Sequence, residues 1–304
     1  MFFCNRAKFT PGRSGGSRFW VLLFAAVLVC WPVMAPAKGA KEGPRFAKLD
    51  RMRVHYESYG QGSDALVFVH GWTCDLSFWK DQVPAFKDKT RVILIDLPGH
   101  GLSDKPRIAY TMDLFARAVE AVLRESKVNR AVLVGHSMGT PVIRQFYRKY
   151  PEKTIALVIV DGSLRPFPDK AAAEKFFEPL RGPNYAIAAE RLIDGMLQPM
   201  ADPVLKGEIK AAMLRTPQYV AVSAMEGMLN EGIWQQDKIT VPTLAIMAQA
   251  SNWAADNEQF DRSIAPNLDY QTWPEVSHFL MMEKPKEFSS ALSNFLVKIG
   301  FLKR

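Results

Sequence analysis

One serine of this sequence stands in a pattern that makes it a candidate nucleophile. Ser137 is the central residue of Gly135-His136-Ser137-Met138-Gly139, a G-x-S-x-G run that follows an apolar stretch and precedes a helical pattern. In a strand–turn–helix of this kind the serine sits on a tight turn, and the flanking glycines leave room for that turn. The backbone N–H of Met138 can then face a developing oxyanion. The pattern predicts attack by Ser137 on a carbonyl carbon.

A serine nucleophile needs a general base, because a free hydroxyl is a weak nucleophile near neutral pH. The sequence has five histidines: His55, His70, His100, His136 and His278. His278 comes after the last predicted strand and before the final predicted helix, so its loop can overhang the sheet edge that carries the serine. His136 is interpreted as a neighbour that points off the turn, and His70 as a buried, hydrogen-bonded side chain. We therefore predict His278 as the base.

The acid that orients this histidine is left open by the sequence. The chain order Ser…Asp/Glu…His places it between the serine and the histidine. The loop after the predicted strand 243–247 is the usual donor, but 249–252 contains no carboxylate. Asp161 directly follows an earlier predicted strand and equally fits a turn residue, whereas Asp256 equally fits a helix N-terminus. Asp161 is our first candidate, Asp256 the alternative, and another acid such as Glu258 comes third.

A second oxyanion donor is expected from the loop after an earlier strand. Here an apolar stretch ends in His70-Gly71-Trp72, and the N–H of Trp72 is the candidate. Cys74 follows closely but has no partner pattern around it, so we interpret it as a small packed side chain.

Short apolar runs and helical patterns alternate along the chain. After an alternating, hairpin-like stretch at 45–58, strands are predicted at Ala65–Val69, Arg91–Ile95, Ala131–Val134, Ile155–Val160, Thr243–Met247 and Leu268–Trp273. Helices are predicted at Thr111–Ser126, with Thr111 as N-cap, and at Met138–Tyr150 and Pro285–Ile299. Near-continuous apolar strands are typical of a parallel sheet that is buried on both faces. The alternation predicts an α/β fold with a doubly wound, mostly parallel sheet.

The stretch 164–236 interrupts this alternation. It contains no strand-like run, but several helical fragments separated by seven prolines, together with five methionines. About 70 residues are too many for a structureless connection inside a domain. We predict an inserted helical cap at 164–236, with the α/β core formed by 38–163 and 237–304.

The first 37 residues have the pattern of a secretory signal peptide. Four basic residues precede an apolar stretch at 19–31, and Ala35-Pro36-Ala37 supplies the small residues of a cleavage site. Cleavage near Ala37 predicts an exported protein, periplasmic or secreted; the alternative is an uncleaved N-terminal membrane anchor. Removal of the leader lowers the formal net charge from +8 to +4 and leaves Cys74 as the remaining cysteine. This mild charge excess gives no case for nucleic-acid binding.

Four motifs occur together in an order that resembles the α/β-hydrolase superfamily. They are Val69-His-Gly-Trp72, Asp96-Leu-Pro-Gly-His-Gly-Leu-Ser-Asp104, Gly135-His-Ser-Met-Gly139 and Val276-Ser-His-Phe-Leu280. The resemblance runs from about Arg45 to the C-terminus and is to the capped, esterase-like branch. It implies Ser137 as nucleophile, His278 as base, an oxyanion hole at Trp72 and Met138, and no metal or organic cofactor. The loop after strand 243–247 departs from the family pattern, because it lacks the expected acid. The family's dehalogenases and epoxide hydrolases carry an aspartate at the position of Ser137, so this serine argues against both activities.

These residues together predict a serine hydrolase that cleaves a carboxylic ester, or a related acyl compound, through an acyl-enzyme intermediate. The expected partner is a small, partly apolar ester-like molecule, with membrane contact only through an uncleaved leader. A lactonase, a C–C bond hydrolase or a cofactor-free haloperoxidase would use the same residues, since specificity depends on cap side chains. A non-catalytic ligand-binding homologue is the alternative outside enzymes. The natural substrate and the oligomeric state are not readable from the sequence.

Overall fold

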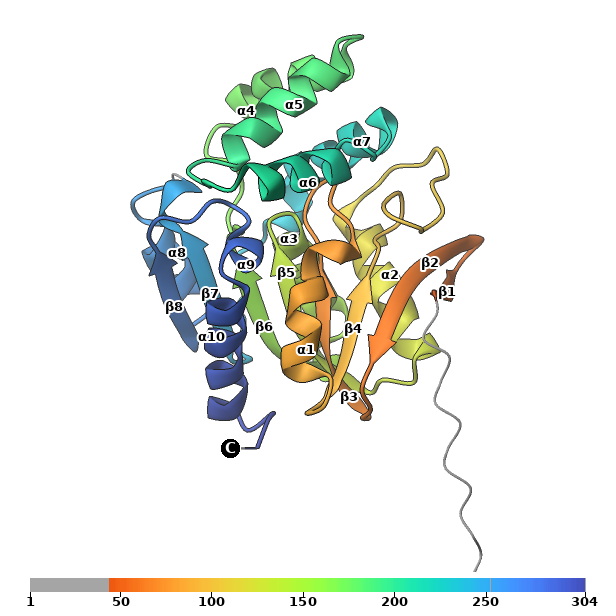
Figure 1. Cartoon of the computed structure of the whole chain (residues 1–304), viewed down its shortest axis with the longest axis vertical. Helices are drawn as coiled ribbons and strands as arrows, with labels where there is room; N and C mark the ends of the chain where they lie inside the picture. Colours follow the sequence, from red (N-terminus) through yellow and green to blue (C-terminus); the bar gives the residue numbers. More distant parts are fainter. Residues whose placement is uncertain (1–43, 252, 304) are drawn as a thin grey trace, which may run out of the picture. The chain divides into compact units, whose positions relative to one another are not determined.

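A mostly parallel sheet forms the centre of the computed structural model, which describes residues 44–251 and 253–303 (Figure 1). In these residues the strand order is β1-β2-β4-β3-β5-β6-β7-β8. The strands are β1 Arg45–Leu49, β2 Met52–Tyr59, β3 Asp64–Val69, β4 Arg91–Ile95, β5 Arg130–His136, β6 Thr154–Val160, β7 Thr243–Ala248 and β8 Leu268–Trp273. β1 and β2 pair antiparallel, as do β2 and β4, and the pairs from β4 to β8 are parallel. The predicted doubly wound, mostly parallel sheet is confirmed.

Helices lie on both faces of this sheet. They are α1 Val83–Phe86, α2 Met112–Glu125, α3 Gly139–Lys149, α8 Asn257–Ile264, α9 Leu280–Glu283 and α10 Pro285–Lys298, with short 3-10 helices at Leu76–Gln82, Pro151–Lys153 and Gln249–Ser251. α1 and α10 lie in front of the sheet in Figure 1, and α2 and α3 lie behind it. The predicted N-cap of α2 is present, because the hydroxyl of Thr111 accepts a 3.1 Å hydrogen bond from the N–H of Leu114.

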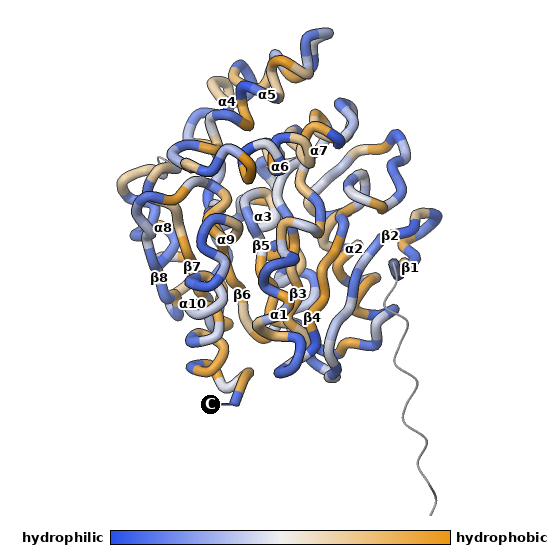
Figure 2. Tube along the Cα trace, viewed as in Figure 1, coloured by the Kyte–Doolittle hydropathy of each residue, from blue (hydrophilic) through white to orange (hydrophobic). Residues whose placement is uncertain are grey.

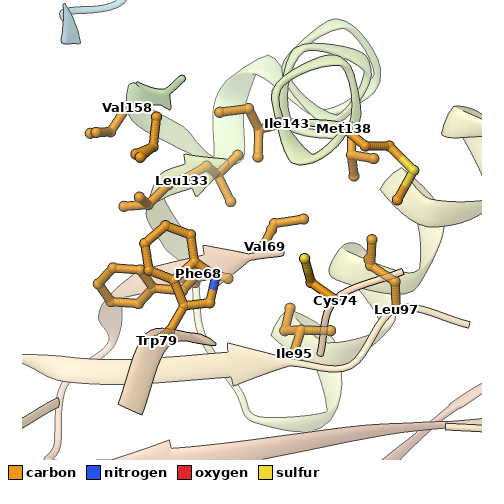
Figure 3. Packing of buried hydrophobic residues seen from close by; sticks show 14 of the residues in the cluster. Phe68, Val69, Cys74, Trp79, Ile95, Leu97, Leu133, Met138, Ile143 and Val158 are labelled. Atoms are coloured by element: carbon orange, nitrogen blue, oxygen red, sulfur yellow. The ribbon is translucent and has the colours of Figure 1, made fainter. Parts of the chain in front are cut away.

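The central strands are apolar along almost their whole length, as burial on both faces requires. Figure 2 shows this as orange strands between helices of mixed colour. Figure 3 shows part of the packing, in which Phe68 of β3 contacts the ring of Trp79, 4.9 Å away between ring centres. Cys74 is 1% exposed within the same cluster, and burial raises the pKa of its thiol well above the ordinary value. Cys74 is therefore a packed, protonated side chain, as predicted.

A strand-free segment lies between β6 and β7 in the described chain. Its elements are α4 Lys170–Phe177, the 3-10 helix Glu178–Arg181, α5 Tyr185–Met196, α6 Pro203–Met213, α7 Gln218–Leu229 and the 3-10 helix Glu231–Ile233. We call residues 164–236 the helical insertion. It lies over the ends of the strands that carry the candidate site (Figure 1). Its limits as a separate domain stay a prediction.

Hydrogen bonds fasten the helical insertion to the loops beneath it. Trp72 donates its indole N–H to the carbonyl of Ala221 at 2.8 Å. The hydroxyl of Tyr219 donates to the carbonyl of Lys105 at 2.6 Å. The loops that shape the site are thus bonded directly to the insertion.

The predicted leader, residues 1–37, lies outside the described residues. Among the residues that are described, none of the helices has the length and apolar character needed to cross a bilayer. Export and cleavage near Ala37 stay predictions.

Candidate active site

Ser137 lies on a sharp turn between β5 and α3. Its φ angle is +53°, a left-handed conformation that side-chain-bearing residues adopt at an energetic cost. The turn is held by two backbone hydrogen bonds, from the N–H of Ser137 to the carbonyl of Val160 at 3.0 Å, and from the N–H of Thr140 to the carbonyl of Ser137 at 2.9 Å. The predicted strand–turn–helix context of Ser137 is therefore present.

The two glycines of the turn are required by close backbone contacts. A Cβ atom on Gly135 would lie 2.5 Å from the carbonyl oxygen of Gly139. A Cβ atom on Gly139 would lie 2.5 Å from the carbonyl oxygen of Val69. Both contacts are with backbone, which cannot move aside without shifting β3 or α3. The glycines thus let the serine turn pack against the loop that carries Trp72.

His278 is joined to Asp161 in the folded chain. The Nδ1–H of His278 donates to Oδ2 of Asp161 at 2.6 Å, and the two side chains are 12% and 0% exposed. Because Nδ1 is engaged, Nε2 is the ring nitrogen left to exchange a proton with a ligand or with Ser137. Ser137 and His278 line the same cavity but make no hydrogen bond in the described chain. Such bonds often tighten only when substrate binds.

The backbone of His278 is held from two sides. Its N–H donates to the carbonyl of Met196, the last residue of α5, at 3.2 Å. Its carbonyl accepts a 2.9 Å hydrogen bond from Nε2–H of His136, whose ring centre lies 4.6 Å from that of His278. His136 is thus a neighbour that supports the histidine loop, as the sequence suggested, and the helical insertion supports it as well.

Asp161 accepts three further hydrogen bonds, one from the last residue of β7 and two from the segment that follows it. The N–H of Ala248 and the indole N–H of Trp253 each donate to Oδ1 at 2.8 Å, and the hydroxyl of Ser251 donates to Oδ2. Together with the bond from His278, these hydrogen bonds hold the buried carboxylate of Asp161 in a fixed position. The loop expected to supply the acid therefore supplies donors to an acid that comes from β6.

Sequence reasoning did not single out Ser251 or Trp253. Neither residue type indicates a role by itself, and their contact with Asp161 spans about 90 positions of sequence. One indirect signal was present in the sequence: the loop after β7 lacks a carboxylate, which indicates that the acid comes from another element.

Asp256 and Glu258 form ion pairs with arginines, and neither forms one with His278 in the described chain. Asp256 is 59% exposed on its side chain and pairs with Arg165 at 2.7 Å. Glu258 pairs with Arg262 one helical turn later, at 2.8 Å. Of the three acids considered from the sequence, Asp161 is the one that the structure brings to the histidine.

The two candidate oxyanion donors line the same cavity as Ser137. The side chain of Met138 is 1% exposed and packs in the core (Figure 3), and that of Trp72 is 2% exposed. Buried side chains anchor both residues, which restricts the orientation of their backbones. Among the turn and loop hydrogen bonds of the described chain, none uses the N–H of Trp72 or of Met138. Both N–H groups are therefore available to a ligand oxygen.

The cavity in front of Ser137 has a volume of about 630 Å³. The α/β core contributes Trp72, Ser137, Met138, Pro141, Gly162, Ser163, Ala250, Ser251, Trp253, Ala254, Asn257 and His278, and the helical insertion contributes Arg165, Pro166, Phe167, Pro168, Phe176, Phe177, Leu192, Gly195, Met196, Gln198, Met225, Met228 and Trp234. Most of the second group are apolar. The insertion therefore forms a mostly apolar roof over a floor that contains Ser137, His278 and further hydroxyl and amide groups.

Three further histidines are buried near the site, His70 and His100 in loops and His136 at the end of β5. His70 accepts a 3.0 Å hydrogen bond from the N–H of Leu97, which ties the loops after β3 and β4 together. Burial lowers the pKa of His70, and burial together with nearby His70 lowers that of His100 to about 3. Burial, followed by the proximity of His278, places the pKa of His136 well below its ordinary value. These three rings are neutral in the folded protein at pH 7.

Within residues 44–251 and 253–303, no group of three or more histidine, cysteine, aspartate or glutamate side chains is arranged to hold a metal ion. The polar groups of the cavity floor are those suited to acyl transfer: a hydroxyl, an imidazole held by a carboxylate, and two free N–H groups.

Asp261 lies in α8 close to the cavity floor and makes stability depend on pH. It is fully buried, and Asn257, which lines the cavity, donates to its Oδ2 at 3.0 Å. Burial raises the pKa of Asp261 from 3.8 to about 7, although Arg165 and Arg144 act in the opposite direction. Between about pH 4 and pH 7 the folded protein thus holds a proton that the unfolded chain has lost. Stability from this group is present at low pH and is lost as the pH rises.

We expect Asp261→Asn to remove this pH dependence. The free energy of unfolding of the variant, minus that of the wild type, should grow between pH 4 and pH 8 by up to about 4 kcal/mol, because one pKa unit corresponds to about 1.4 kcal/mol. Denaturant unfolding at several pH values measures this difference. A difference that stays constant across the range would contradict the raised pKa.

Comparisons with known proteins agree with this architecture. A model described as "Alpha/beta hydrolase family" matches residues 66–291. The dihydrolipoyllysine-residue acetyltransferase component of the acetoin cleaving system of Cupriavidus necator is 35% identical over 117 residues, which are 38% of this chain and 31% of that protein. That match therefore spans less than a third of the relative's length.

Two solved structures match over most of this chain. A thermophilic esterase from Thermogutta terrifontis is 25% identical, with a TM-score of 0.75, and the match covers 86% of this chain and 99% of that one. An N-acyl homoserine lactone degrading enzyme is 27% identical, with a TM-score of 0.70 and coverage of 83% and 100%.

Proposed function

Since the chain belongs to the α/β-hydrolase family and is a hydrolase, we propose that it cleaves carboxylic esters through a Ser137–His278–Asp161 triad. The single observation that carries the proposal is the 2.6 Å hydrogen bond between His278 and the buried Asp161, in a cavity that Ser137 also lines. A carboxylate at Nδ1 fixes the tautomer in which Nε2 can accept a proton, and it stabilises the imidazolium that then forms.

In the acylation step, Oγ of Ser137 attacks the ester carbonyl carbon while Nε2 of His278 takes the hydroxyl proton. The carbonyl π electrons move to oxygen, and the N–H groups of Trp72 and Met138 bind the resulting oxyanion. When the tetrahedral intermediate collapses, the C–O bond to the alcohol breaks, and the alcohol oxygen receives the proton from His278. The products of this step are a free alcohol and Ser137 esterified by the acyl group.

In the deacylation step, water takes the place of the alcohol. His278 removes a proton from water as the water oxygen attacks the acyl carbon, and the same two N–H groups bind the second oxyanion. Collapse breaks the bond to Oγ, which regains its proton from His278, and a carboxylic acid leaves. Losing one oxyanion donor in such enzymes costs on the order of 3 kcal/mol of transition-state stabilisation.

The roof of the cavity supports an apolar group on the substrate. Phe176 and Phe167 at the start of the helical insertion, together with Leu192, Met225 and Met228, line it. Methionines adapt to irregular ligands because their side chains are flexible and polarizable. Burial of each methylene group contributes roughly 0.8 kcal/mol. We therefore expect the enzyme to prefer esters with several methylene groups over acetates.

A lactone is the second candidate substrate. It is favoured by the 27% identity to the N-acyl homoserine lactone degrading enzyme, which this chain matches over its full length. The chemistry of the two steps is the same, except that the alcohol stays attached to the acyl group as a hydroxy acid. The choice between ester and lactone depends on how the cavity holds the ring.

A series of p-nitrophenyl esters from acetate to decanoate, beside a panel of lactones, tests this function. We expect kcat/KM to rise with acyl length until the chain fills the cavity, and then to level off or fall. Release of nitrophenolate, and titration of the acid formed from lactones, measure the rates. An enzyme that cleaves none of these compounds contradicts the proposal.

A further inference from the structure

The cavity contains one permanently charged side chain among the described residues that line it. This residue is Arg165, in the loop that joins β6 to α4. No carboxylate belongs to the lining of the cavity in the described chain. The other lining residues are polar but uncharged or apolar, apart from the imidazole of His278. A positive charge beside an apolar roof is costly unless an anion neutralises it.

The guanidinium of Arg165 is held in place rather than free to move. It lies over the ring of Phe260, 4.8 Å from the ring centre. Its Nη1 donates to Oδ1 of Asp256 at 2.7 Å, and the side chain is 23% exposed. The backbone N–H of Arg165 also donates to the hydroxyl of Ser163 at 3.1 Å. An arginine oriented in this way loses little entropy when it binds a ligand.

Asp256 leaves part of the guanidinium available. A guanidinium has five N–H donors, and in the described chain the side-chain acceptor for Arg165 is a single oxygen of Asp256. Asp256 is 59% exposed, so water screens its charge more than that of Arg165. The nearby Asp261 compensates only weakly, because its burial favours the neutral carboxyl. The other side-chain N–H donors of Arg165 are thus left to bind an anion in the cavity that Arg165 lines.

We propose that Arg165 binds a carboxylate on the substrate, so that the site accepts half-esters of dicarboxylic acids, or similar anionic acyl compounds, in preference to neutral esters. The inference rests on the proposed function, because it places the acyl group between Ser137 and Arg165. A planar carboxylate matches the planar fork of a guanidinium. The apolar roof then covers the methylene groups between the carboxylate and the ester.

The test compares pairs of substrates that differ only in charge. Mono-p-nitrophenyl esters of succinate, glutarate, adipate and suberate are measured beside the same compounds with the free carboxyl capped as a methyl ester. For at least one chain length, the ratio of kcat/KM for the anionic to the capped ester should fall roughly tenfold or more in Arg165→Gln, as loss of a hydrogen bond to a charged group predicts. In Arg165→Lys, which keeps the charge but not the planar fork, this ratio should lie between that of the wild type and that of Arg165→Gln.

Two further variants sharpen the comparison. Asp256→Asn removes the competing carboxylate and should raise the ratio. Arg181→Gln is the matched control, because Arg181 belongs to the helical insertion, pairs with Glu226 at 3.1 Å and does not line the cavity. The ratio in that control should stay at the wild-type value. A ratio that Arg165→Gln leaves unchanged at every chain length overturns the proposal.

Binding without turnover separates this inference from the proposed function. In a Ser137→Ala background, calorimetry should show that Arg165→Gln weakens binding of the anionic esters and leaves the capped esters unaffected. If the wild type cleaves no ester, this binding difference still supports the carboxylate site. If the wild type cleaves the capped esters and neither ratio nor binding depends on Arg165, the carboxylate site is wrong while the esterase proposal stands.

Discussion

Replacing Ser137 with alanine is expected to lower kcat for p-nitrophenyl esters by roughly a millionfold, the size of loss found when a serine hydrolase loses its nucleophile. The variant keeps His278, Asp161 and both oxyanion N–H groups, so a small residual rate above that of water should remain. Steady-state assays with enough enzyme to measure a very slow reaction give this residual. The physical reason is that no other hydroxyl occupies the strained turn between β5 and α3.

Labelling with a fluorophosphonate gives an independent measure of the same group. The folded wild type should be modified on the peptide that contains Ser137, and Ser137→Ala should not be modified there. Thermal unfolding of both proteins serves as the control for folding, because alanine and serine bear a similar strain at a φ of +53°. A folded wild type that takes no label at Ser137 would point to the non-catalytic, ligand-binding alternative.

Asp161→Asn is expected to lower kcat by roughly ten-thousandfold, since the corresponding change in a serine protease has that effect by favouring the wrong tautomer of the histidine. Here the effect has a second cause. Asp161 accepts four hydrogen bonds, and an amide has one oxygen in place of two, so its NH₂ group would face donors such as Ser251 or His278. We therefore also expect the variant to be less stable, and kcat must be corrected for the folded fraction.

Asp256→Asn is the matched control for this prediction, as the other aspartate that the sequence allowed. Its carboxylate is exposed and pairs with Arg165, away from the histidine. We expect its kcat on neutral esters to fall less than tenfold. A large loss in Asp256→Asn beside a small loss in Asp161→Asn would show that the acid is Asp256 after all. A loss of less than a hundredfold in both variants would leave Glu258 or another acid to be found.

Two hydrogen bonds hold the backbone of His278, and one of them connects the helical insertion to the proposed base. The carbonyl of Met196, at the end of α5, accepts the N–H of His278, and the ring of His136, next to Ser137, donates to the carbonyl of His278. A ligand that moves α5 would thus change the orientation of His278, the proposed base, directly. The insertion both lines the cavity and helps to position one of the groups that would react.

Much of this architecture is determined locally and could be predicted from the sequence. Ser137 was identified because a tight turn between a strand and a helix needs glycines on either side, and the contacts of Gly135 and Gly139 show why. The strands were predicted closely because burial on both faces requires continuous apolar runs. Thr111 was identified as a helix cap because its hydroxyl bonds within its own turn. The helix cap depends on a contact within its own turn, and the glycine and apolar patterns are visible in the local sequence even where the contacts behind them, such as that of Gly139 with Val69 of β3, involve other elements.

Only the tertiary structure decided which carboxylate contacts His278 and which charged side chain lines the cavity. The local sequence leaves both Asp161 and Asp256 open as the acid, and 117 residues separate Asp161 from His278. The choice between them depends on the pairing of β6 with β7, where Val160 lies opposite Ile246, because this register brings Asp161 under the segment that carries Ser251 and Trp253. Contacts between neighbouring strands leave no local pattern that residue types could reveal. Local patterns were enough to predict Ser137 as nucleophile and His278 as base, whereas only the folded sheet decided which carboxylate meets His278.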